Sequence, residues 1–196
     1  GDGALAVQLL EYYLERKLGF GDIVKPDHGC PGPEEVYLGQ GTVLLLIDTQ
    51  WWLHDWDKPA VDDGCDVDNT ADFLVALDDA IKRNHDKKII VAGHHAIRSS
   101  GRRGGHFPLK THLFPLTEAE KKLYLPLPGA GTLYVLYGML LGDDQDQSNP
   151  RHTMMSRALL QVFSQHENLV YLSGNERSLE YPTTKNIHLV NAGSIT

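Results

Sequence analysis

Apolar and polar residues along this chain follow two patterns, one with helical spacing and one typical of buried strands. Apolar side chains at helical spacing in residues 4–17 predict an amphipathic helix. Residues 35–39 alternate like a strand, with Val36 and Leu38 expected to face inward. The continuous apolar run TVLLLID at 42–48 predicts a central strand that is buried on both faces.

The remaining apolar segments alternate between helices and strands. A cap at Asn69 or Thr70 opens a helical pattern that runs to about residue 84, and a second helical pattern covers 151–165. Further buried strands are predicted at 89–91, 168–173 and 187–191. Because strand, helix and strand follow one another, we expect parallel pairing with a right-handed crossover.

These elements predict one α/β domain over residues 1–196, with a mixed sheet whose central parallel strands are flanked by helices. A chain of 196 residues is long enough for one domain with a substantial core. The formal net charge of −8 argues against a general nucleic-acid binder, because phosphate contacts need a basic surface.

A hydrophobic insertion interrupts the pattern at about 107–148. It contains a run of about 20 uncharged residues, which is the length that a membrane-spanning helix needs. Pro126 and Pro128, with Gly129 and Gly131, divide this run into pieces too short for one such helix. We therefore expect a lid or docking element that contacts a protein or a membrane surface through Leu123–Leu141.

Cys30 and Cys65 fall in predicted loops on either side of the strand at 42–48 and lack the spacing of metal ligands. Two states remain open for them, a disulfide and a pair of free thiols. A disulfide would imply an extracytoplasmic location, periplasmic or secreted, because thiols in the cytosol are kept reduced.

The segment KKIIVAGHHAIRSSGRRGGH at 87–106 places a polar loop at the carboxyl end of a predicted strand. Open α/β sheets bind ligands beyond the carboxyl ends of their strands. The imidazole of His94 can bind a divalent metal, and Arg98, Arg102 and Arg103 can donate to a phosphate substrate. The alternative interpretation is a core histidine beside a solvated basic loop.

His95 also has two interpretations. One is a catalytic role beside the metal ligand or facing the substrate, and the other is a histidine packed in the core. We interpret His54, His112 and His152 as surface or structural residues, and His106 as a solvated one.

Two strand ends carry a glycine followed by polar residues, VAGHH at 91–95 and LSGNERSLEY at 172–181. This order resembles the later half of the calcineurin-like metallophosphoesterases, the family that includes the purple acid phosphatases. In that family one strand ends in Gly-His, often before a loop like SSG, and the next ends in Gly-His-x-His. VAGHHAIRSSG matches the first element, and SLEY is similar to the run after the second. The resemblance covers about residues 42–194, without the insertion.

The resemblance implies that His94 is a metal ligand and that Asn175 stands at the position of a family histidine. Gly174-Asn175-Glu176-Arg177 replaces Gly-His-x-His, however, and an amide oxygen is a weak ligand for a transition metal. Arg177 stays protonated and cannot ligate. The family's earlier motifs, Asp-x-His, Gly-Asp-x-x-Asp and Gly-Asn-His-Asp/Glu, do not occur before Gly41. The resemblance therefore implies either the later half of a longer protein or a version without its metal site.

The activity implied by the resemblance is hydrolysis of a phosphate ester by a pair of divalent metal ions (Fe, Zn or Mn). One ion generates hydroxide, and both hold the phosphoryl oxygens. Since most family ligands are missing, we expect this chain alone to be incomplete or inactive, and to hold the metal pair only if the site is completed.

Two other functions stay open. One is a non-catalytic scaffold or binding module that uses the insertion, or that binds an anion through its arginines. The other is a cysteine hydrolase, because LLLIDTQ at 44–50 is similar to the opening strand of isochorismatase-like enzymes, with Asp48 as the acid.

Overall fold

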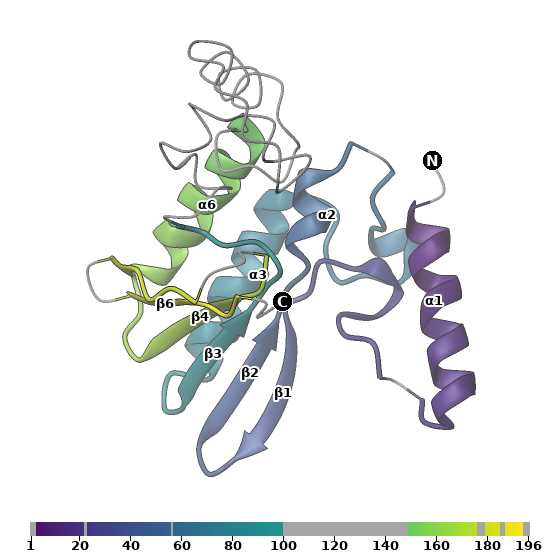
Figure 1. The fold of residues 1–196 in the computed structure, drawn as a ribbon, viewed down its shortest axis with the longest axis horizontal. Coiled ribbons are helices and arrows are strands. Elements are labelled where there is room, and N and C mark those ends of the chain that lie inside the picture. Colours follow the sequence, from purple (N-terminus) through teal and green to yellow (C-terminus); the bar gives the residue numbers. More distant parts are fainter. Residues whose placement is uncertain are drawn as a thin grey trace, which may run out of the picture.

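The computed structural model describes residues 3–21, 23–55, 57–99, 149–175, 179–184 and 187–193. Its centre is a six-stranded mixed sheet in the order β1-β2-β3-β4-β6-β5 (Figure 1). The strands are β1 (Glu34–Gly39), β2 (Thr42–Leu46), β3 (Lys88–Ala92), β4 (Leu169–Ser173), β5 (Thr183–Thr184) and β6 (Ile187–Asn191). β2, β3, β4 and β6 pair in parallel, whereas β1 and β5 run antiparallel at the edges. The predicted α/β fold with parallel central strands is confirmed.

The helices are α1 (Gly3–Leu18), α2 (Thr49–Leu53), α3 (Thr70–Arg83) and α6 (Pro150–Phe163), with 3-10 turns at Asp27–Gly29 and Val61–Asp63. The side-chain oxygen of Asn69 accepts hydrogen bonds from two backbone N–H groups in the first turn of α3, and that of Asn149 accepts one, from the backbone N–H of Arg151, at the start of α6. The capping hydrogen bonds therefore fix where both helices begin. Across the described part of the chain, no helix combines the length and the apolar character needed to cross a membrane.

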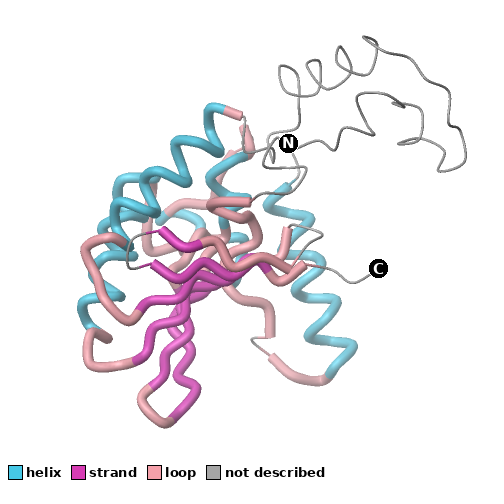
Figure 2. Tube along the Cα trace, turned by 60° about the vertical axis from the view of Figure 1, so that its left-hand side comes forward, coloured by secondary structure: helices cyan, strands magenta, loops and turns pink. Residues whose placement is uncertain are grey.

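The main core lies between the sheet and the helices α3 and α6, which Figures 1 and 2 show along one side of the strands. Alternate strand residues enter this core, such as Val43 and Leu45 of β2, and their neighbours Leu44 and Leu46 stay partly exposed. The prediction of a strand buried on both faces is therefore wrong. The sheet adds β3 and then β4 in one direction, and because connections between parallel strands are almost always right-handed, both helices are expected on the same face.

Helix α1 is present as predicted, but its apolar side chains are not buried. Leu9 is 59% exposed, whereas Glu11 is only 7% exposed. The carboxylate of Glu11 accepts a hydrogen bond of 3.0 Å from the backbone N–H of His28, in the 3-10 turn that α1 contacts. The neighbour of α1 is thus a turn with a polar backbone group, and this contact directs the acidic face of the helix inward.

The edge strand β1 also differs from its prediction, because Leu38 is exposed rather than inward. The register between β1 and β2 shifts between Tyr37 and Gly39, so strict alternation ends there. An irregularity of this kind re-aims side chains near the end of a strand.

Helix α2, which the sequence patterns do not predict, follows β2 directly. Asp48 caps its start, and the buried indole of Trp51 donates a hydrogen bond of 3.0 Å to the carbonyl oxygen of Pro59. At its other end, the ammonium of Lys58 donates to the carbonyls of Trp51 and Trp52. A cation at the carboxyl end of a helix is favourable, because the last carbonyls have no partner within the helix.

Cys30 and Cys65 form a disulfide with a Cα–Cα distance of 5.5 Å, so the disulfide alternative is confirmed. It joins the segment before β1 to the loop before α3. These are the two cysteines of the chain, and neither is left as a thiolate nucleophile. The cysteine-hydrolase alternative is therefore wrong for this state of the protein.

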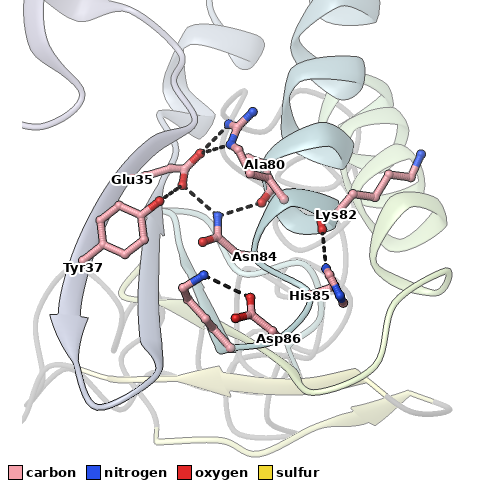
Figure 3. Close-up of polar contacts among 9 residues, drawn as sticks. Glu35, Tyr37, Ala80, Lys82, Asn84, His85 and Asp86 are labelled. Atoms are coloured by element: carbon pink, nitrogen blue, oxygen red, sulfur yellow. Dashed lines mark hydrogen bonds and ion pairs between the residues drawn. The ribbon is translucent and has the colours of Figure 1, made fainter.

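The carboxylate of Glu35 joins β1 to the end of α3 (Figure 3). It accepts hydrogen bonds from the guanidinium of Arg83 (Nε, 3.0 Å), the hydroxyl of Tyr37 (2.8 Å) and the amide of Asn84 (2.7 Å). Burial raises the pKa of Glu35, but the hydrogen bonds from these residues outweigh burial and hold the pKa below its usual value.

Replacing Glu35 by Gln is expected to lower the free energy of unfolding by about 1 kcal/mol near neutral pH, because charge-assisted hydrogen bonds are lost. Since the folded pKa lies below the unfolded value of 4.5, this contribution is present above pH 4.5 and disappears as the pH falls through the folded pKa. Urea unfolding of the parent and the variant at neutral and acidic pH measures this contribution to the free energy of unfolding. The exposed Glu167→Gln is the control, and an equal loss in both variants would contradict the role of Glu35.

Candidate functional site

The carboxyl ends of β2, β3 and β4 meet at one edge of the sheet and lead to Asp48, His94 and Asn175. The carbonyl oxygen of His94 accepts hydrogen bonds from the backbone N–H groups of Gly174 (3.2 Å) and Asn175 (3.0 Å). Residues 94 and 175 are thus brought together by neighbouring parallel strands. Their roles as metal ligands remain predictions.

A hollow of about 400 Å³ lies at this edge, and Asp48, His94 and Lys25 contribute its charged or titratable side chains. Its other lining residues include Leu46 and Ala92, which belong to the partly exposed face of the sheet. Burial raises the pKa of the Asp48 carboxyl, although the backbone N–H groups of α2 and the nearby His54 and His94 oppose this shift. The hollow therefore combines an exposed imidazole with a carboxyl group that is costly to ionise.

His95 is 0% exposed and does not line this hollow. Its Nδ1 atom lies 2.8 Å from the hydroxyl of Thr49, and its backbone N–H donates to the same oxygen at 3.1 Å. Its ring packs edge-on to that of His94, with 4.8 Å between the ring centroids. Of its two interpretations, this position agrees with the packed histidine.

Gly93 allows neighbouring side chains to come close to the backbone between β3 and His94. A Cβ atom on Gly93 would lie 2.6 Å from the hydroxyl oxygen of Tyr171 and 3.0 Å from Cγ2 of Thr49. The Tyr171 hydroxyl donates a hydrogen bond of 2.7 Å to the carbonyl oxygen of His95, and burial raises its pKa. Glycine at 93 is thus a packing requirement as well as a strand-ending signal.

His152, in the first turn of α6, is a buried member of this region that sequence reasoning left among surface or structural residues. Its ring lies edge-on to His95, with 6.1 Å between centroids, and its Nδ1 atom is 3.2 Å from the hydroxyl of Ser156. Burial lowers the pKa of His152 to about 4. The apolar spacing of residues 151–165 was the available signal, because it places position 152 near the inner face.

The free energy of unfolding is expected to fall by about 2 kcal/mol between neutral pH and about pH 5 through His152 alone. The pKa of His152 is 6.5 in the unfolded chain and about 4 in the folded chain, so stability is lost as the pH falls between these two values. Urea unfolding of His152→Asn across the same pH range should show a smaller decline than the parent. An unchanged slope would contradict this assignment.

The remaining predicted site residues are only partly described. Arg98 is exposed in the loop after β3. Arg102, Arg103, the insertion at 107–148 and its segment Leu123–Leu141 lie outside the described residues. Within the described ranges, no three or more His, Cys, Asp or Glu side chains are grouped so that they could hold a metal ion.

No protein-family model matches this chain, and no curated protein matches it either. Among solved structures, it is similar to a protein described as a 5'-nucleotidase from Staphylococcus aureus, solved at 2.05 Å in complex with alpha-ketoglutarate. The identity is 13% and the TM-score 0.37, over 82% of this chain and 23% of that chain. This chain thus spans less than a quarter of that protein's length, and a similarity at this level supports neither a family nor a function.

Proposed function

We propose that this chain carries one side of a metal-dependent phosphoesterase site, with His94 as a metal ligand and a phosphate ester as the substrate. The main support is the VAGHHAIRSSG segment, because its His94 is exposed at the carboxyl edge of the sheet, beside the strand that leads to Asn175. Ligand sites of open α/β sheets lie at this edge.

The described residues do not fit a pair of metal ions by themselves. His94 offers one ring nitrogen, and Asn175 offers only an amide oxygen, whereas a dinuclear centre needs several ligands for each ion. We therefore assign no hydrolytic step to them. Further ligands would have to come from residues that pack over the partly exposed face of the sheet, where the hollow opens.

The test measures metal content and hydrolysis of p-nitrophenyl phosphate in the same preparations. If the site is completed by further ligands, the parent hydrolyses the ester with Mn²⁺ or Zn²⁺ supplied, and we expect His94→Ala to lower this hydrolysis at least about 100-fold and to lower the bound metal, because a ligand is lost. His85→Ala is the matched control, since His85 is exposed near the amino end of β3 and contacts the carbonyl of Lys82 at 3.0 Å.

A second candidate is anion or partner binding without hydrolysis. Asn175 and Arg177 stand where the family has two ligating histidines, and an arginine cation repels a dication. Phosphate binding by a chain that neither holds metal nor hydrolyses the ester would support this candidate. The predicted contact of Leu123–Leu141 with a protein or a membrane surface would be part of this second function, and it stays a prediction.

The disulfide supports a proposal on location. Cys30 and Cys65 are joined, and structural disulfides persist in oxidising compartments. We propose that the protein works in the periplasm or after secretion. Thiol labelling of the protein taken directly from cells tests this, because a cytosolic protein would label at both cysteines.

A further inference from the structure

Asn191, the last residue of β6, has a carboxamide that joins three neighbouring segments at the carboxyl edge of the sheet. Its Nδ2 group donates to the carbonyl oxygen of Arg98 at 2.8 Å and to the carboxylate of Glu180 at 3.3 Å. Its Oδ1 atom accepts from the hydroxyl of Ser173 at 2.7 Å. Asn191 is only 1% exposed; its bond with Ser173 is buried, and its bonds with Arg98 and Glu180 are partly buried.

The loop that follows β3 is held at several backbone positions. The carbonyl of His94 accepts from two amides after β4, and the carbonyl of His95 accepts from the hydroxyl of Tyr171. The bond from Asn191 fixes the carbonyl of Arg98, further along the same loop. One end of the loop is thus tied to β4, and the Arg98 end is tied to β6.

The chemistry of this position requires an amide. Both hydrogens of Nδ2 are used, one toward each acceptor, and the opposite oxygen accepts from a hydroxyl. An aspartate of the same size could not donate to Arg98 and would place a second carboxylate beside Glu180. A buried group that loses its partner in this way destabilises its surroundings.

We infer that Asn191 is a positioning residue, which holds the loop after β3 so that His94 and Arg98 keep a fixed relation where a phosphate group would bind. This inference rests on the proposed function. It assigns to β6 a part in anion binding, although β6 itself supplies none of the residues that we expect to touch the anion.

The experiment compares Asn191→Ala and Asn191→Asp with Asn84→Asp. Asn84 is the matched control, because it is also fully buried and its Nδ2 group also donates to a carboxylate and a backbone carbonyl, those of Glu35 and Ala80. It lies at the end of α3, in the Glu35 cluster of Figure 3. Any general loss of stability from a buried carboxylate should therefore appear in both aspartate variants.

Two readouts are needed. The first is the affinity for inorganic phosphate, with Zn²⁺ present and absent. It is measured from the changes in the NMR signals of the His94 ring on titration. We expect both Asn191 variants to weaken phosphate binding at least about 10-fold and Asn84→Asp to stay within about twofold, because only Asn191 holds the loop. Equal weakening in all three variants, or an effect within about twofold at Asn191, would overturn the inference.

The second readout is hydrogen exchange of the backbone amides in residues 94–99 relative to those in α3. Loss of the Arg98 bond should speed exchange in the loop at least about 10-fold in Asn191→Ala and leave it unchanged in Asn84→Asp. If the parent protein binds neither Zn²⁺ nor phosphate, the proposed function fails. The exchange data then still decide the positioning role, since equal exchange rates in the two variants would reject it.

Discussion

Replacing Cys30 and Cys65 together by serine is expected to lower the free energy of unfolding by roughly 4 kcal/mol, which would be the largest effect of any change considered. The disulfide closes a loop between residues 35 positions apart. In the chain-entropy model, a loop of this length removes roughly 4 kcal/mol of conformational freedom from the unfolded chain. Both cysteines are buried, so the serines also leave imperfectly packed hydroxyl groups.

Urea unfolding of the oxidised parent, the reduced parent and the double-serine variant separates these contributions. Reduction removes the covalent link and leaves the side chains in place, so most of the loss should already appear in the reduced parent. A midpoint that does not change on reduction would contradict a stabilising role for the disulfide. A loss seen only with serine would indicate packing rather than loop closure.

Replacing Gly93 by Ala is expected to cost about 3 kcal/mol, because overpacking in a closed core has no inexpensive relief. The added Cβ would lie 2.6 Å from the hydroxyl oxygen of Tyr171, with Thr49 and Ile47 on its other sides. Tyr171 is fully buried and donates to the carbonyl of His95. A movement of the Tyr171 ring that relieves the clash would therefore weaken this bond to the loop that carries His94.

Gly174→Ala is the matched control, since both glycines precede a predicted site residue at the end of a parallel strand. A Cβ atom on Gly174 would meet nothing within 4 Å, and the variant should stay within about 0.5 kcal/mol of the parent. Thermal and urea unfolding measure both variants. Equal stability of the two would show that the close approach of Tyr171 to Gly93 does not limit the packing.

The helices α3 and α6 and the central strands were predictable because their signals are local. Asn69 and Asn149 cap helices whose apolar residues recur at helical spacing, and each of the predicted strands, all of which lie in the described ranges, is present. Helix α2 has only five residues, too few for a periodic pattern to be recognised. The residues after Asp48 therefore carry no sequence signal for a helix.

The residues that hold the loop of the candidate site in place could not be predicted from the local sequence pattern. Thr49 is 46 positions from His95, Tyr171 is 76 positions from it, and Asn191 is 93 positions from Arg98. A threonine, a tyrosine and an asparagine at these places carry no distinguishing signal, because each residue type is common at strand and helix ends. Their roles arise only where the chain brings them together.

By itself, the sequence determined the helices α1, α3 and α6 and the strands β1, β2, β3, β4 and β6, and it placed residues 94 and 175 directly after two strands of the same sheet. The physical reason is that parallel strands place their carboxyl ends together. Only the tertiary structure decided which face each side chain occupies. The crossovers put α3 and α6 on the same side, so His94 lines the open hollow and His95 and His152 are buried behind it.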